Sequence, residues 1–259
     1  MSSYVEFIFL FLMAVLGGAL NGTISGGWFI VFPSLIYGGV QPINGNASTM
    51  AVLLAGDIAS SEPVKNGYEV SKKCFRYMLA TCAIGGLLGA YLLVFFSHTV
   101  FETIAPYLLL CSWLLFVFYN PLLRYINYKA EGELFRYSHT KLLPVFILGI
   151  YGGYFGAGMG MLICMLLTIY GIKNNDTING MKILLISLNN GIAIFIFLWS
   201  GLIYWPFVII MIMGSAIGGY FTIAFSKRVN IVIVKRIMIV IGAIVTLYFL
   251  NIINLKEIL

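Results

Sequence analysis

The first 64 residues contain no lysine or arginine, and nearly all later basic residues fall into a few short clusters. Apolar segments separate these clusters, and many have about the twenty residues that a helix needs to cross a membrane. Of the 259 residues, 61% are hydrophobic and only 9% are charged, and the mean hydropathy is +1.00. Soluble domains carry about 25% charged residues. The sequence therefore predicts an all-α polytopic membrane protein in contact with a lipid bilayer.

Other classes of protein fit the composition poorly. The net charge of +6 could indicate a nucleic-acid partner, but the cations flank apolar segments, as topology signals do, so we expect no nucleic acid. The four cysteines are far apart and show no disulfide or metal-ligand spacing. There is no nucleotide-binding P-loop. We expect no metal and no cofactor.

Ten apolar segments can be delimited, and three of them are too short to cross a bilayer as ideal helices. The short ones are the second, sixth and seventh. In order, the segments span residues 4–24, 27–40, 45–62, 75–97, 103–123, 142–157, 160–172, 177–199, 204–226 and 232–252.

Glycine-rich breaks join the short segments to their neighbours. The first break spans 22–27 and the second spans 152–160. A break inside the membrane leaves backbone groups unpaired, and it is tolerated only where the backbone is buried in protein or lines a wet cavity. Each half of the chain is therefore predicted to begin with a broken element, which three transmembrane helices follow.

An internal repeat relates the two halves. Residues 84–97 align without gaps on 213–226, with five identities in fourteen positions. Upstream, 18–22 aligns on 149–153, so the two glycine breaks are equivalent, and with one gap Asp57 falls on Asn189. The glycine pairs Gly85/Gly89 and Gly214/Gly218 have the spacing typical of close helix packing.

The charges of equivalent loops indicate that the repeats are inverted. The loop at 65–76 holds four cations and its counterpart at 200–204 holds none, whereas the uncharged loop near 97–102 corresponds to a basic stretch at 227–236. Because basic loops face the cytoplasm, equivalent loops should lie on opposite sides of the membrane.

A consistent topology follows if each broken element enters and leaves on the same side. Residues 1–124 then form the first membrane repeat, 125–141 a cytoplasmic connecting loop and 142–259 the second repeat. Thirteen of the fifteen cations become cytoplasmic, the exceptions being Lys182 and Lys256. We expect a multi-pass protein of the cell (inner) membrane with both termini outside.

The glycine motifs resemble those of the sulfite exporter (TauE/SafE-type) permeases. The first copy reads GALNGTISGGWFIVFPSLIYGGVQP, with Trp28 replacing one family glycine. The second copy, GIYGGYFGAGMGMLICMLLTIYG, matches the family pattern G-x-x-G-G-x-F-G-x-G-x-G, and NGMKIL at 179–184 is also similar. The resemblance covers nearly the whole chain and implies secondary transport of a small sulfur-containing or organic anion, such as sulfite or a sulfonate.

The breaks hold the first candidate binding residues. Helices that start at such breaks direct N–H groups and positive dipole ends into the membrane interior, which suits an oxyanion. Close packing alone is the alternative explanation. The candidates are Asn21, Thr23, Ser25, Gly26, Gly27, Gly156, Gly158 and Gly160.

Two charged residues lie within apolar surroundings. Asp57 is a candidate proton-coupling group, because a buried carboxylate is costly unless it is protonated or paired. The alternative is a solvated or hydrogen-bonded residue near the cytoplasmic edge. Lys182 could bind the anion, as the family resemblance favours, or extend to the cytoplasmic face.

Polar residues at equivalent places in the two halves complete the candidate site. Amides in membrane helices need partners, so these residues could bind the ligand or hydrogen-bond neighbouring helices. They are Asn46, Ser48, Thr49, Asn179, Asn189 and Asn190.

The sequence thus favours a secondary anion transporter, with Asp57 as the candidate group for proton coupling. A membrane-embedded enzyme is an alternative, but no histidine or lysine is suitably spaced to activate Ser25 as a nucleophile, so we do not expect an enzyme. A non-transporting membrane scaffold is the other alternative, and it explains neither the repeat nor the paired breaks.

Overall fold

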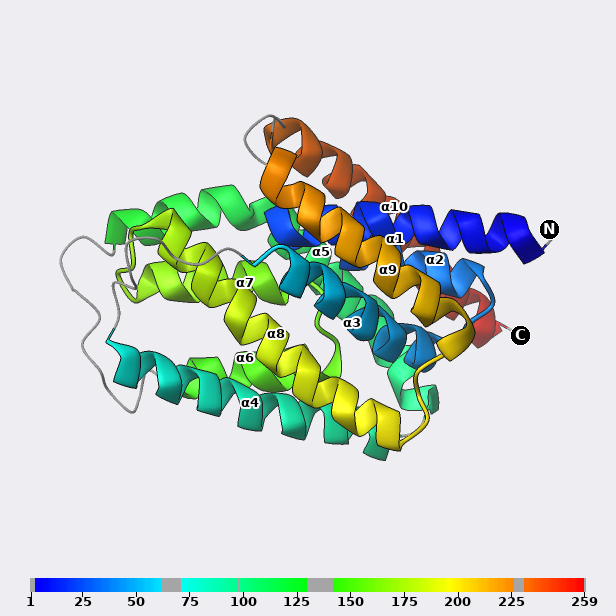
Figure 1. The fold of residues 1–259 in the computed structure, drawn as a ribbon. Helices are drawn as coiled ribbons and strands as arrows, with labels where there is room; N and C mark the ends of the chain where they lie inside the picture. Colours follow the sequence, from blue (N-terminus) through cyan, green and yellow to red (C-terminus); the bar gives the residue numbers. More distant parts are fainter. Residues whose placement is uncertain (1–2, 62–70, 97, 130–141, 226–230, 259) are drawn as a thin grey trace.

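The computed structural model describes residues 3–61, 71–96, 98–129, 142–225 and 231–258, and every regular element in these ranges is an α-helix (Figure 1). The ten helices are α1 (Ser3–Ile24), α2 (Trp28–Tyr37), α3 (Pro42–Ala59), α4 (Lys72–Phe95), α5 (His98–Lys129), α6 (Leu142–Tyr154), α7 (Met159–Ile169), α8 (Asn175–Trp199), α9 (Trp205–Phe225) and α10 (Ile231–Ile258).

The predicted segments correspond to these helices one for one, and the predicted all-helical class is confirmed within the described ranges. The short second, sixth and seventh segments are the short helices α2, α6 and α7. Six helices (α1, α4, α5, α8, α9 and α10) are long and apolar enough to cross a membrane. The protein is therefore a multi-pass membrane protein. α3 is not among the six, because polar residues in its first half lower its hydropathy.

Some predicted boundaries are wrong. α5 runs from His98 to Lys129, well beyond the predicted 103–123, and it continues into the predicted connecting loop. α4 begins at Lys72, capped by Ser71, whose hydroxyl accepts a hydrogen bond from the Cys74 N–H. An apolar run indicates only the part of a helix that can lie in the bilayer. The hydrogen-bonded helix can extend beyond that run through polar residues, as α5 does. The rest of the predicted connecting loop, 130–141, lies outside the described residues.

Helices of one half pack on helices of the other half in a reciprocal pattern. α1 packs along α9, and its counterpart α6 packs along α4, the counterpart of α9. In the same way, α3 packs on α9 and α8 packs on α4 (Figure 1). Two halves related by a two-fold axis would show this exchange. The inverted relation, in which that axis lies in the membrane plane, stays a prediction.

Glycines make these crossings close. A Cβ at Gly89 of α4 would lie 2.1 Å from the Ile150 carbonyl oxygen of α6, and a Cβ at Gly218 of α9 would lie 1.9 Å from that of Val15 in α1. Gly85 and Gly214 face backbone at the same two crossings. The predicted packing role of both glycine pairs is confirmed.

Candidate functional site

Both predicted breaks are present as interruptions between short helices. α1 ends at Ile24 and α2 begins at Trp28, while α6 ends at Tyr154 and α7 begins at Met159. Ser25, with φ +57°, is the one non-glycine residue with positive φ in the described chain, and the second break uses Gly156 (φ +79°) and Gly158 (φ +73°). Glycine adopts this conformation without steric cost. The prediction that continuous helices do not run through these motifs is confirmed.

The repeat alignment places the N-caps of the two short helices in register. Gly27 precedes α2 and Gly158 precedes α7, and the ungapped offset that pairs Gly22 with Gly153 also pairs these two residues. The N–H groups of Gly27 and Gly158 make no hydrogen bond within the described part of the chain. Each short helix therefore starts with a free backbone donor and the positive end of its dipole.

The two breaks contact each other in the protein interior. A Cβ at Gly160 would lie 2.1 Å from the Ser25 Oγ, and a Cβ at Gly156 would lie 3.3 Å from the Met50 side chain. Ser25 is only 6% exposed. Both breaks are thus enclosed by protein, as the sequence predicts, whereas their depth in the bilayer stays a prediction.

A small cavity lies where the breaks meet. Its polar lining consists of Asn21, Ser25 and Asn190, which come from α1, the first break and α8. Gly156 and Gly160 expose backbone to it, and the remaining lining is apolar, from Trp28, Met50, Leu53, Met159 and Ile186. The cavity has room for little more than one water molecule. Residues from both halves of the chain therefore line one small cavity.

Asp57 is hydrogen-bonded to a residue that lines this cavity. Asn21 Nδ2 donates a hydrogen bond of 2.7 Å to Asp57 Oδ1, while Asp57 Oδ2 is buried without a partner among the described residues. Asp57 is 2% exposed, so it is not solvated. Its bond to Asn21 agrees with the alternative explanation of a hydrogen-bonded residue. Its position links a titratable group to the cavity lining through one amide.

Lys182 is also enclosed by protein. It is 3% exposed and lies within electrostatic range of Asp57, yet the described residues give its ammonium group no hydrogen bond or ion pair. A lysine that extended to the cytoplasmic face would be more exposed.

Several candidate residues make structural contacts instead of lining the cavity. Thr23 Oγ1 donates to carbonyls of its own helix, Thr49 Oγ1 donates to the Gly45 carbonyl, and Ser48 Oγ accepts from the Tyr204 N–H. Asn179 is exposed. A role for these four residues in binding stays a prediction that the geometry does not support.

Two asparagines tie the second break to other helices. Asn46 Nδ2 donates to the Tyr154 carbonyl at the end of α6 (3.0 Å). Asn189 Nδ2 donates to the carbonyls of Cys82 (3.2 Å) and Gly149 (3.1 Å), which joins α8 to the α4–α6 crossing. These bonds support the alternative of hydrogen bonding between helices. Gly26 also lies away from the cavity, against Phe116 and Met238.

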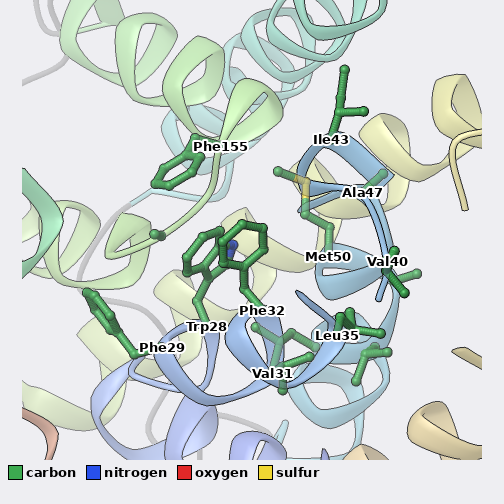
Figure 2. Packing of buried hydrophobic residues seen from close by; sticks show 14 of the residues in the cluster. Trp28, Phe29, Val31, Phe32, Leu35, Val40, Ile43, Ala47, Met50 and Phe155 are labelled. Carbon is green, nitrogen blue, oxygen red and sulfur yellow. The ribbon is translucent and has the colours of Figure 1, made fainter. Parts of the chain in front are cut away.

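Trp28 is a cavity residue that the sequence reasoning did not select. Its ring stacks on Phe32 (centroids 4.2 Å apart) and contacts Phe155 of the second break (4.6 Å), as Figure 2 shows. A tryptophan within a glycine-rich break was the available signal, because a large ring at such a turn must occupy the space between the breaks.

The family model for the sulfite exporter TauE/SafE matches residues 10–249. The chain belongs to the sulfite exporter TauE/SafE family. The match spans both breaks and every residue that lines the cavity.

Curated relatives of this TauE/SafE chain are named as transporters. The probable membrane transporter protein YfcA of Escherichia coli K12 is 25% identical, over 81% of this chain and 76% of its own length. The probable membrane transporter protein ORF9 of Sinorhizobium sp is 24% identical, over 90% and 88%. The probable membrane transporter protein YunE of Bacillus subtilis is 23% identical, over 91% and 95%. No solved structure matches the chain significantly.

Proposed function

We propose that this chain is a secondary transporter that carries a small sulfur-containing or organic anion, such as sulfite or a sulfonate, through the cavity between its two breaks. The observation that carries the proposal is the cavity itself, where two short helices begin and polar side chains from both halves converge. Family membership and the names of the relatives support transport.

The charge distribution favours an anion. Free N–H groups and two helix N-termini supply positive partial charge, and Lys182 supplies a full charge nearby in the interior. Sulfite is larger than a water molecule, so the closed cavity must expand to admit it. Relative movement of the two reciprocally packed groups of helices would open the cavity to one side at a time.

Proton coupling is assigned to Asp57. A buried carboxylate oxygen without a partner is costly, so burial favours the protonated form of Asp57. Exposure to water favours the charged form. Asn21 lines the cavity and bonds to this carboxyl group, so occupancy of the cavity and the protonation of Asp57 can influence each other.

Transport by purified protein in liposomes tests the proposal. We expect radiolabelled sulfite or a short sulfonate to accumulate when a proton gradient is imposed, and we expect empty liposomes to show no uptake. A screen of sulfite, sulfonates and carboxylates for thermal stabilisation would rank the substrates. Protein that folds but neither transports nor is stabilised by any of these anions would contradict the proposal and favour the scaffold or enzyme alternatives.

A further inference from the structure

The indole N–H of Trp28 is a buried hydrogen-bond donor without an acceptor in the described part of the chain. Its Nε1 has no partner among the described residues, and the residue is 2% exposed. Trp113, in contrast, donates its Nε1 proton to the Ile239 carbonyl at 2.8 Å. Trp28 lines the cavity, so a ligand atom that entered there is a candidate partner for this donor.

The surroundings of Trp28 fix its ring at the cavity. It is the first residue of α2, and Phe32 on the same helix stacks on one part of the ring. Phe155, from the other break, contacts it as well. Aromatic contacts of this kind restrict the ring to one orientation, so the indole N–H is held in place before any ligand arrives.

At equivalent positions of the repeat, the two halves contribute different residue types to the cavity lining. With the offset that pairs Gly27 and Gly158, the counterpart of Trp28 is Met159, and both residues line the same cavity. The first half therefore contributes a hydrogen-bond donor at the position where the second half contributes a thioether.

We propose that Trp28 is a ligand-binding and specificity-determining residue whose indole N–H donates a hydrogen bond to an oxygen of the transported anion. Met159, its counterpart in the repeat, lines the same cavity and offers no such donor. This inference rests on the proposed transport function. In this arrangement the Trp28 side chain makes a contact to the anion that a backbone N–H group of the first break could also make.

The substitution Trp28→Phe tests this role, because it keeps an aromatic ring and removes the donor. We expect binding of sulfite or methanesulfonate, measured by calorimetry on purified protein, to weaken by about tenfold or more, the usual effect of losing one hydrogen bond to a charged group. The melting temperature without ligand should fall somewhat, because phenylalanine is smaller than the buried tryptophan, so the anion affinity is the measurement that decides the role. Trp113→Phe is the matched control, and it should lower the melting temperature while leaving the anion affinity unchanged.

Fluorescence provides a second measurement that does not require Trp28 to be replaced. In protein with Trp113, Trp199 and Trp205 changed to phenylalanine, the emission of Trp28 should shift when either anion binds. Unchanged affinity in Trp28→Phe would overturn the inference and leave the proposed function intact. An unchanged Trp28 emission on binding would do the same. If unmodified protein binds neither anion, the proposed function fails for these substrates and the inference fails with it.

Discussion

At the scale of single residues, two buried polar atoms near the cavity lack partners among the described residues. They are Trp28 Nε1, on a residue that lines the cavity, and Asp57 Oδ2, on the carboxyl group that accepts the bond from Asn21. Other buried polar atoms in the described ranges also lack partners, among them Asn189 Oδ1 and Ser215 Oγ. The position of Trp28 and Asp57 relative to the cavity, and not the missing partner alone, therefore makes them candidates for a functional role.

Asp57→Asn should abolish anion accumulation driven by a proton gradient and leave counterflow exchange largely intact. The amide keeps an oxygen that can accept the bond from Asn21, so the fold should survive, but it cannot bind and release a proton. Transport into liposomes with and without a pH difference measures both activities. Asp176→Asn, at an exposed position in the first turn of α8, is the control and should behave like unmodified protein. Gradient-driven transport at the unmodified rate in Asp57→Asn would exclude the coupling role.

Lys182→Met should weaken anion binding by about tenfold or more, because an interaction with a charged group contributes about 1.5–3 kcal/mol. Methionine has a similar length and no charge, so the folded protein should not lose stability. Titration calorimetry with sulfite or methanesulfonate gives the affinity. The exposed Lys72→Met provides the control. An affinity equal to that of unmodified protein would show that Lys182 acts only within the fold.

At the scale of secondary-structure elements, the two breaks have both a structural and a proposed chemical consequence. They end α1 and α6 inside the protein and start α2 and α7 there, so that two helix N-termini meet at one place. The long helices around them cross at glycines, which brings the two halves close enough to enclose the cavity. Residues at these helix ends, together with residues of α3 and α8, line the cavity.

Gly158→Val should reduce anion binding more than it reduces the yield of folded protein. Valine at φ +73° strains the backbone by about 1–3 kcal/mol and distorts the start of α7. Gly201→Val is a matched control, since its φ is +68° and no atom lies within 4 Å of the added Cβ. The control should show the same loss of stability and normal anion affinity. Equal affinities in the two variants would separate the second break from binding.

The sequence was sufficient to predict the elements because apolar runs and glycine clusters are local signals. The ten helices, the two breaks and the glycine crossings all follow from them. Contacts between distant residues do not: Asn21 and Asp57 are 36 positions apart, and only the fold brings them together. Thr23 was a reasonable candidate by its position in the break, yet its hydroxyl bonds to its own helix. Which side of its helix a residue occupies determines whether it lines the cavity, and the sequence alone does not show this.

At the scale of the whole molecule, reciprocal packing makes each half complete the other. α4 belongs to the first half but packs on α6 and α8, and α9 belongs to the second half but packs on α1 and α3 (Figure 1). Neither half could enclose the cavity alone, because its lining comes from both. An inverted relation between the halves would make the site accessible from either side of the membrane by equivalent movements.

The inverted topology predicts which surfaces face outward. In protein without its four native cysteines, a cysteine introduced at Ser200, in the turn before α9, should react with a membrane-impermeant thiol reagent in intact cells. A cysteine at Lys73, in the first turn of α4, should react only after the membrane is permeabilised. Both positions are exposed in the structure. The opposite labelling pattern would contradict the predicted orientation.

If both breaks form one anion site, a single ion should be found where they meet. Selenite has the shape and charge of sulfite and scatters X-rays anomalously, so crystals of the protein grown with selenite can locate the ion. We expect one anomalous peak in the cavity that Asn21, Ser25 and Asn190 line, within hydrogen-bond distance of the Trp28 indole nitrogen and of the backbone that begins α7. A peak at another place, in protein that transports selenite, would contradict the account.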